Sequence, residues 1–120
     1  MVEGTKDAYK LWHGYHLILP KPERNSLGQR VDILFVESIE AIATASFLSP
    51  KEKLPHVRLA IRKTDTLKIL LMILWEIKSL DDAKYIALSL KIDLVGKMLG
   101  GWSGQLQKQN LTPSKEGVRK

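Results

Sequence analysis

The sequence contains no cysteine among its 120 residues. Disulfides and thiolate zinc sites are therefore excluded, and the composition agrees with a reducing cytosol. The chain also has no run of about 18 consecutive apolar residues, the length that a membrane-spanning helix requires. No export signal with a basic start and an apolar middle stands at the N-terminus. We therefore expect a cytoplasmic protein that does not enter a membrane.

Strand signals are missing as well, since neither strict apolar-polar alternation nor an Asn-Gly hairpin turn occurs. Four stretches instead place apolar residues at helical spacing, and short connectors with proline or polar residues join them. The apolar content of 44% is enough for one core. We predict an all-α fold, an up-down antiparallel four-helix bundle over residues 1–103. A basic flexible tail is expected over residues 104–120.

Capping residues predict where the four helices begin. Thr5, Ser26 and Ser49 each precede an apolar stretch, and Ser49 is followed by a proline and, three residues on, by an acid. Ser79 and Asp82 mark the start of the fourth helix.

Proline and glycine predict where these helices end or bend. Pro20 should end the first helix, and Pro55 should kink or restart the third. Gly100 and Gly101 should let the backbone leave the fourth helix at little cost.

One face of each predicted helix is apolar and is expected to form the core. Small and large side chains contribute to all four faces. The expected core residues are Ala8, Leu11, Trp12, Tyr15 and Leu19 in the first helix, Leu27, Val31, Leu34, Phe35, Ile42 and Ala45 in the second, Val57, Ala60, Ile61, Thr64, Leu67, Leu71, Leu74 and Trp75 in the third, and Ala83, Ala87, Leu90, Leu94 and Gly101 in the fourth.

The third and fourth helices carry more apolar residues than one core can bury. Seven consecutive apolar residues from Ile69 to Trp75 cover the whole circumference of a helix. We predict that the excess is buried between identical subunits, most simply in a closed ring. A broad intramolecular core and a helix lying on a membrane surface are the alternatives. The predicted interface residues are Ile33, Val36, Ile69, Met72, Ile73, Tyr85, Leu88, Ile92, Val95, Leu99 and Trp102.

Basic residues give the chain a net charge of +6, from 19 Lys and Arg against 13 Asp and Glu. Such an excess attracts polyanions, and contacts from lysine and arginine to phosphates give salt-dependent, largely sequence-independent affinity. A ring would repeat each contact in every subunit. For any single residue, a solvated charged surface is the alternative. The predicted nucleic-acid-binding residues are Arg24, Arg30, Arg58, Arg62, Lys63, Lys68, Lys84, Lys91 and Lys97.

No set of residues in the sequence indicates catalysis. His13 and His16 share a helical face but have no carboxylate near them in sequence, so they form an incomplete metal site. Asp81 and Asp82 are explained by the dipole at a helix start. Zinc-protease, nucleophile-elbow and kinase signatures do not occur. We expect a protein that is not an enzyme and that has no cofactor and no metal.

Two motifs resemble the accessory variability determinant (Avd) proteins of diversity-generating retroelements. They are Ser26-Leu27-Gly28-Gln29-Arg30 and Leu94-Val95-Gly96-Lys97-Met98-Leu99-Gly100-Gly101-Trp102, with a looser match at Leu67-Lys68-Ile69-Leu70-Leu71. The resemblance covers most of the chain in outline. It implies a cytoplasmic homopentamer of four-helix bundles that binds the retroelement's reverse transcriptase and RNA or DNA during error-prone cDNA synthesis. It also implies that the protein supplies no catalytic residue.

The family's basic positions are only partly retained. Lys68 and Lys97 stand where the family usually carries a basic residue, whereas Met72 replaces a residue that is commonly basic. Two other functions remain open: a protein-interaction adaptor, and a bundle protein of the kind encoded in ribosomal RNA intervening sequences.

Overall fold

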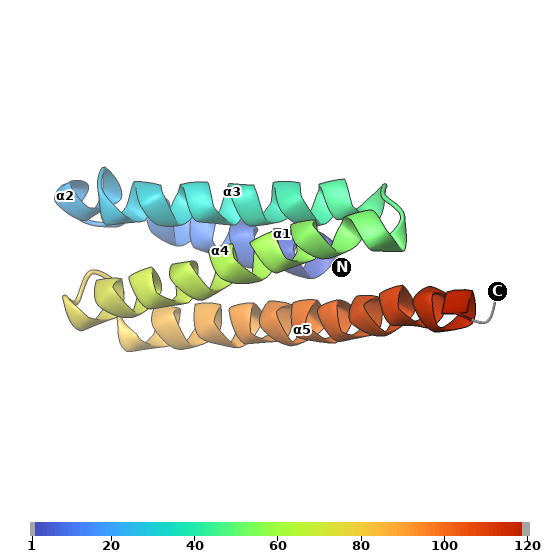
Figure 1. The fold of residues 1–120 in the computed structure, drawn as a ribbon. Coiled ribbons are helices and arrows are strands. Elements are labelled where there is room, and N and C mark those ends of the chain that lie inside the picture. Colours follow the sequence, from blue (N-terminus) through green and yellow to red (C-terminus); the bar gives the residue numbers. More distant parts are fainter. Residues whose placement is uncertain (1, 119–120) are drawn as a thin grey trace.

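The computed structural model describes the backbone of residues 2–118 and the side chains of residues 2–111. The described chain is all-helical, as predicted, and four long helices pack against one another with alternating direction (Figure 1). A short helix, α2, lies between the first two long ones. The helices are α1 (Val2–Leu17), α2 (Lys21–Arg24), α3 (Leu27–Ser46), α4 (Pro50–Glu76) and α5 (Asp82–Val118).

Each long helix has two main neighbours. α3 packs against α1 and α4, and α5 packs against α1 and α4. α1 has 16 residues and α5 has 37, so α1 covers only part of the bundle (Figure 1). The remaining length is built from α3, α4 and α5. None of the helices in the described part of the chain has the length and apolar content needed to cross a membrane.

The core consists of two apolar clusters with a layer of hydroxyl groups between them. On α3, Ser38 lies between Phe35 of the first cluster and Ala41 of the second. Thr64 on α4 and Thr5 on α1 separate the two clusters in the same way. All three hydroxyl-bearing residues are buried. Most of the predicted core of α1, α3 and α4 is confirmed, because it supplies these clusters.

Ser49 begins α4 as predicted. Its backbone N–H donates to Glu52 Oε1 at 3.4 Å as part of a capping box, and its hydroxyl donates to the same oxygen at 3.1 Å. The predicted kink or restart at Pro55 does not divide the helix, which runs without interruption to Glu76. Pro55 lies in the second turn, where the loss of one N–H donor affects few of the helix's hydrogen bonds.

One predicted helix start and one predicted cap are wrong. α1 begins at Val2, so Thr5 lies inside the helix and faces the core instead of capping it. Ser26 does precede α3, but its hydroxyl donates to the carbonyl oxygen of Pro22 at 2.7 Å and makes no cap. Pro22 lies in the short helix α2, which thus supplies this carbonyl.

The start of α5 is also capped differently from the prediction, which named Ser79 and Asp82. Asp81 Oδ1 accepts a hydrogen bond from the backbone N–H of Lys84 at 2.8 Å. This bond, with further contacts to Lys84, holds the pKa of the Asp81 carboxyl below its usual value. The Asp82 carboxylate instead accepts a hydrogen bond from Trp75 Nε1 at 2.8 Å and ties α5 to the end of α4.

Gly100 and Gly101 do not end α5, which continues to Val118. A glycine inside a helix costs about 1 kcal/mol relative to alanine, and packing can outweigh that cost. Leu106 is buried in the second cluster and anchors the helix beyond both glycines. The expected tail therefore begins as a continuation of α5, and residues 119–120 lie outside the described part.

The apolar stripe that faces the core on α5 was predicted wrongly. Leu90 and Leu94, expected in the core, are each 63% exposed. The core is filled instead by the stripe that had been assigned to the subunit interface, on the opposite side of the helix. Its larger side chains fill the space between α1, α3 and α4 better than alanine and glycine would. The four interface residues that are buried within the chain's own core are Leu88, Ile92, Val95 and Leu99.

Candidate nucleic-acid interface

A groove of about 310 Å³ runs between α4 and α5. Two lysines, Lys68 and Lys97, and two aspartates, Asp65 and Asp93, line it. Lys68 Nζ lies 3.6 Å from Asp93 Oδ1, and both side chains are partly exposed. An exposed pair of this kind is worth little in stability, so Lys68 can exchange the carboxylate for a phosphate at small cost.

Glycines leave the α5 side of this groove without projecting side chains at two positions. A Cβ at Gly96 would lie 3.3 Å from Lys68 Nζ, whereas a Cβ at Gly100 would meet no atom within 4 Å. Gly96, Lys97 and Gly100 belong to the motif that carries the resemblance, and all three line the groove. These three positions of the motif therefore belong to a surface, and the motif does not end the helix.

The glycine of the other motif has a packing role. A Cβ at Gly28 would lie 2.9 Å from the carbonyl oxygen of Glu23 and 2.9 Å from Leu19 Cδ1. Gly28 therefore lets the segment around α2 pack closely against the first turn of α3. This glycine supports the fold and contributes no binding group.

Two of the predicted phosphate-binding residues, Lys68 and Lys97, line the groove. We use the name basic rim for three exposed basic residues of α4 and α5: Arg58, Arg62 and Lys97. Arg58 and Arg62 are exposed and four residues apart, so they share the outer face of α4. Lys97 lies on the α5 side. Asp65 is the acidic residue of α4 that lies closest in sequence to this rim.

The other predicted residues do not join the basic rim. Lys63 Nζ pairs with Glu37 Oε1 at 3.0 Å in the groove between α3 and α4. Lys84 pairs with Asp81 Oδ2 at 3.2 Å. Arg24 is half-buried in α2, while the exposed residues Arg30 and Lys91 lie on α3 and α5. The structure therefore separates the nine residues instead of gathering them on one face.

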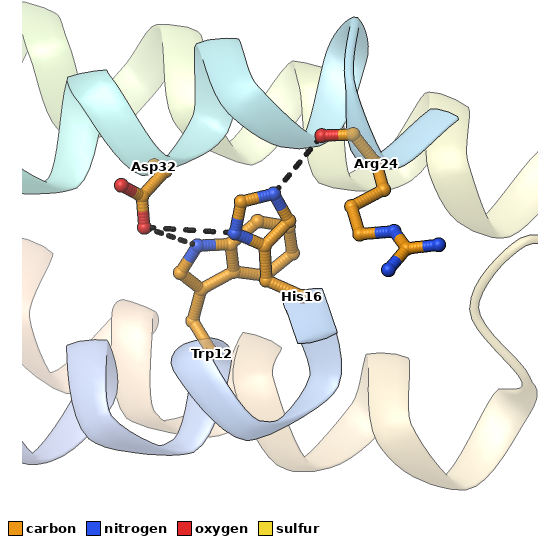
Figure 2. A network of polar contacts seen from close by, with 4 residues as sticks. All are labelled: Trp12, His16, Arg24 and Asp32. Atoms are coloured by element: carbon orange, nitrogen blue, oxygen red, sulfur yellow. Dashed lines mark hydrogen bonds and ion pairs between the residues drawn. The ribbon is translucent and has the colours of Figure 1, made fainter. Parts of the chain in front are cut away.

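A polar network at the α2 end of the bundle engages His16 (Figure 2). Its Nε2 lies 3.1 Å from the carbonyl oxygen of Arg24, and its Nδ1 lies 3.8 Å from Asp32 Oδ1. The His16 ring stacks on Trp12, whose Nε1 donates to the same Asp32 oxygen at 3.2 Å. His13 instead lies beside the ring of Tyr9. Within the described residues, no group of three histidine or acidic side chains could hold a metal ion.

Apolar side chains are exposed over α4 and α5. Ile69 and Met72 on α4 are exposed, as expected for an interface, and so are Ile86, Leu90 and Leu94 on α5. We call these five residues the apolar surface. The sequence prediction missed Ile86 and placed the two leucines in the core. A comparison of stripe size would have reversed that choice, because the alternative stripe has the bulkier residues.

Two contacts between α4 and α5 show which parts of these helices lie side by side. Lys68 pairs with Asp93, and Trp75 stacks on Tyr85 with ring centroids 4.9 Å apart. Residues 69–74 of α4 therefore lie beside residues 86–92 of α5. Ile69 and Met72 of α4 are thus at the same level of the bundle as Ile86 and Leu90 of α5.

The remaining interface residues lie in different settings. Ile33 and Val36 are exposed on α3. Ile73, Tyr85 and Trp102 are half-buried. Trp102 packs on the second cluster with Lys53 Nζ 5.6 Å from its ring centroid. The rings of Tyr85 and Trp102 thus make their main contacts within one chain.

Comparison of the chain with protein-family models, with curated proteins and with solved structures gives no match.

Proposed function

We propose that this protein is a non-enzymatic accessory factor of the Avd type. It self-associates through the apolar surface and binds a reverse transcriptase together with RNA or DNA. The two sequence motifs support this proposal, since one of them lines the groove between α4 and α5. The pentameric state and the cytoplasmic location follow from the resemblance and belong to the same proposal.

The exposure of Leu90 and Leu94 is the observation that carries the proposal. Both are 63% exposed, although the core of the single chain is already filled by other residues of α5. Contiguous exposed apolar side chains in a folded chain mark an interaction site. Homo-oligomers with closed symmetry are the commonest way to bury such a surface.

The basic rim provides the nucleic-acid contact in this proposal. Arg58 and Arg62 are exposed and have no carboxylate within ion-pair distance among the described side chains. Each arginine can form two parallel hydrogen bonds to one phosphate. A ring of subunits would multiply these weak contacts into useful affinity.

Sedimentation velocity on two variants tests the self-association. The double change Leu90→Gln and Leu94→Gln should convert an oligomer into a folded single chain, because it removes the two most exposed side chains of the apolar surface without changing the core. Leu17→Gln, which changes an exposed leucine on α1, is the matched control and should leave the assembly intact. A wild-type protein that sediments as a single chain at high concentration would contradict this part of the proposal.

Filter binding over a salt series tests the nucleic-acid contact. Arg62→Glu and Lys97→Glu should weaken binding to single-stranded RNA and reduce the salt dependence, because each removes one phosphate contact. Lys10→Glu on the exposed side of α1 makes the same change in net charge and should have a smaller effect. Equal losses in all three variants would indicate attraction by net charge alone.

A protein-interaction adaptor is the competing function. It is favoured by the ion pairs of Lys63, Lys68 and Lys84, which neutralise three of the nine candidate phosphate ligands. For an adaptor, a partner protein would bind the apolar surface and nucleic acid would not compete with it. Competition by RNA in a pull-down with the reverse transcriptase would therefore distinguish the two functions.

A further inference from the structure

A small cavity lies in the layer of hydroxyl groups between the two apolar clusters. Its volume is about 10 Å³, and residues of all four long helices line it. Thr5, Ser38 and Thr64 supply its polar groups, and Ile92 and Val95 line it from α5. The three hydroxyl-bearing residues therefore line one cavity, although they come from three different helices.

The hydrogen bonds of these hydroxyls are incomplete. Thr5 Oγ1 and Ser38 Oγ are buried and have no hydrogen-bond partner among the described residues. Thr64 Oγ1 donates to the carbonyl oxygen of Ala60 at 2.7 Å, so its lone pairs remain available as acceptors. A buried hydroxyl without a partner costs free energy, because it has given up its bonds to bulk water.

We propose that this cavity binds one structural water molecule. The water accepts hydrogen bonds from Thr5 Oγ1 and Ser38 Oγ and donates one to Thr64 Oγ1. Three bonds are typical of a buried water, and a volume of about 10 Å³ is close to the smallest that admits one. No larger ligand fits, and the proposal is independent of the function assigned above.

The water bridges α1, α3 and α4 and so fixes their register. A shift of α1 by one turn would move the Thr5 hydroxyl out of the layer and leave Ser38 with a weaker bridge. The apolar clusters on either side cannot replace this contact, because they offer no hydrogen-bonding side chain there. The water thus makes one register of α1 against α3 and α4 more stable than the neighbouring registers.

The alternative is that each hydroxyl turns toward the backbone of its own helix. Thr64 already bonds to the carbonyl four residues earlier, and Ser46 does the same with Ile42 at 3.0 Å. If Thr5 and Ser38 rotated in this way, their hydroxyls would be satisfied and the cavity could remain dry. The experiment therefore has to distinguish a water from two rotated side chains.

Direct detection in the wild-type protein is the first test. A crystal structure that resolves ordered water should show one water within hydrogen-bond distance of Thr5, Ser38 and Thr64. Magnetic relaxation dispersion of water should also reveal one long-lived molecule that disappears in the triple variant Thr5→Val, Ser38→Ala and Thr64→Val. An empty cavity with both hydroxyls bonded to backbone carbonyls would overturn the proposal.

Stability measurements on single variants give a second test, which separates a bound water from a dry cavity with an unpaired hydroxyl. With the water present, Thr5→Val removes one of its bonds and should lower the folded-to-unfolded ratio about tenfold. With a dry cavity and an unpaired hydroxyl, the same change should raise that ratio and would refute the proposal. Thr66→Val is the matched control, because the exposed Thr66 hydroxyl bonds to its own helix at 3.1 Å.

A double-mutant cycle of Thr5→Val and Ser38→Ala tests whether the two hydroxyls share the water. Residues that act through one bridging group show non-additive effects. We expect the double variant to be less destabilised than the sum of the single variants, since the second change removes a bridge that is already broken. Strict additivity would show that the hydroxyls act separately.

Discussion

Trp12 Nε1 donates a hydrogen bond to Asp32 Oδ1 at 3.2 Å and joins α1 to α3 (Figure 2). Trp12 is fully buried, so its N–H has no access to water. The same carboxylate oxygen faces the ring of His16. One acidic side chain therefore satisfies the polar end of the largest core residue and positions the end of α1.

Removal of this carboxylate should destabilise the protein. Asp32→Ala leaves the buried N–H of Trp12 without a partner, which costs about 1–3 kcal/mol. Asp32→Asn is the control, because its amide oxygen can still accept the bond, and it should cost less. Urea denaturation followed by tryptophan fluorescence measures both, and equal losses in the two variants would indicate that the charge matters more than the hydrogen bond.

Tyr9 should make the stability depend on alkaline pH. Burial raises the pKa of the Tyr9 phenol above its ordinary value of 10.0, and a hydrogen bond to Asp32 raises it further. The folded state therefore holds the proton more tightly than the unfolded state. The stabilisation that Tyr9 gives to the folded state is intact below pH 10 and is lost as the pH rises through the folded-state pKa of Tyr9.

The Tyr9→Phe variant checks this dependence. Its stability should fall less steeply above pH 10 than that of the wild type, since Phe carries no titrating proton. Spectrophotometric titration of the wild-type tyrosines should also show a late-titrating phenol that the variant lacks. Identical alkaline profiles would argue against a perturbed Tyr9.

Asp81 should contribute a dependence in the acid range. Its pKa lies below the ordinary value of 3.8, chiefly because the backbone N–H of Lys84 donates to the carboxylate. The stabilisation is therefore present above pH 3.8 and is lost as the pH falls through the lower folded-state value. Asp81→Asn keeps a capping oxygen and should remove this part of the acid sensitivity, as measured by thermal unfolding across a pH series.

Two glycines should respond to alanine in opposite directions. Gly100→Ala places a methyl group in open space and should stabilise the protein by about 0.5–1 kcal/mol, the helix-interior cost of glycine. Gly28→Ala places its Cβ 2.9 Å from the carbonyl oxygen of Glu23 and should destabilise it. Thermal unfolding measures both, and a destabilising Gly100→Ala would show that α5 is less regular at that point.

The helical fold and most of the core of three helices could be predicted from the sequence. Apolar spacing alone fixes the buried face where a helix has one stripe, as in α3, whose stripe includes Val31 and Ile42. α5 has two stripes on opposite sides, and spacing cannot choose between Leu88 and Leu90. Side-chain size does indicate the buried side, because the larger residues of the stripe that contains Leu88 fill the space between helices better.

The candidate site was less predictable than the fold. Lys97 and Arg62 could be named from charge, but the carboxylates that neutralise Lys63 and Lys68 come from other helices and are invisible in local sequence. Gly100 was interpreted, together with Gly101, as a helix exit, because glycine often follows a helix. The role of Gly96 and Gly100 in forming a groove appears only when α4 lies beside them.

The limited length of α1 affects which part of the molecule unfolds first. α1 is the shortest of the four long helices, and it contacts α3 and α5 along only part of their length. Segments with less packed surface open first in the native state. Among the long helices, α1 should therefore show the fastest hydrogen exchange. The first partly unfolded form should be one in which α1 has detached while α3, α4 and α5 remain packed together.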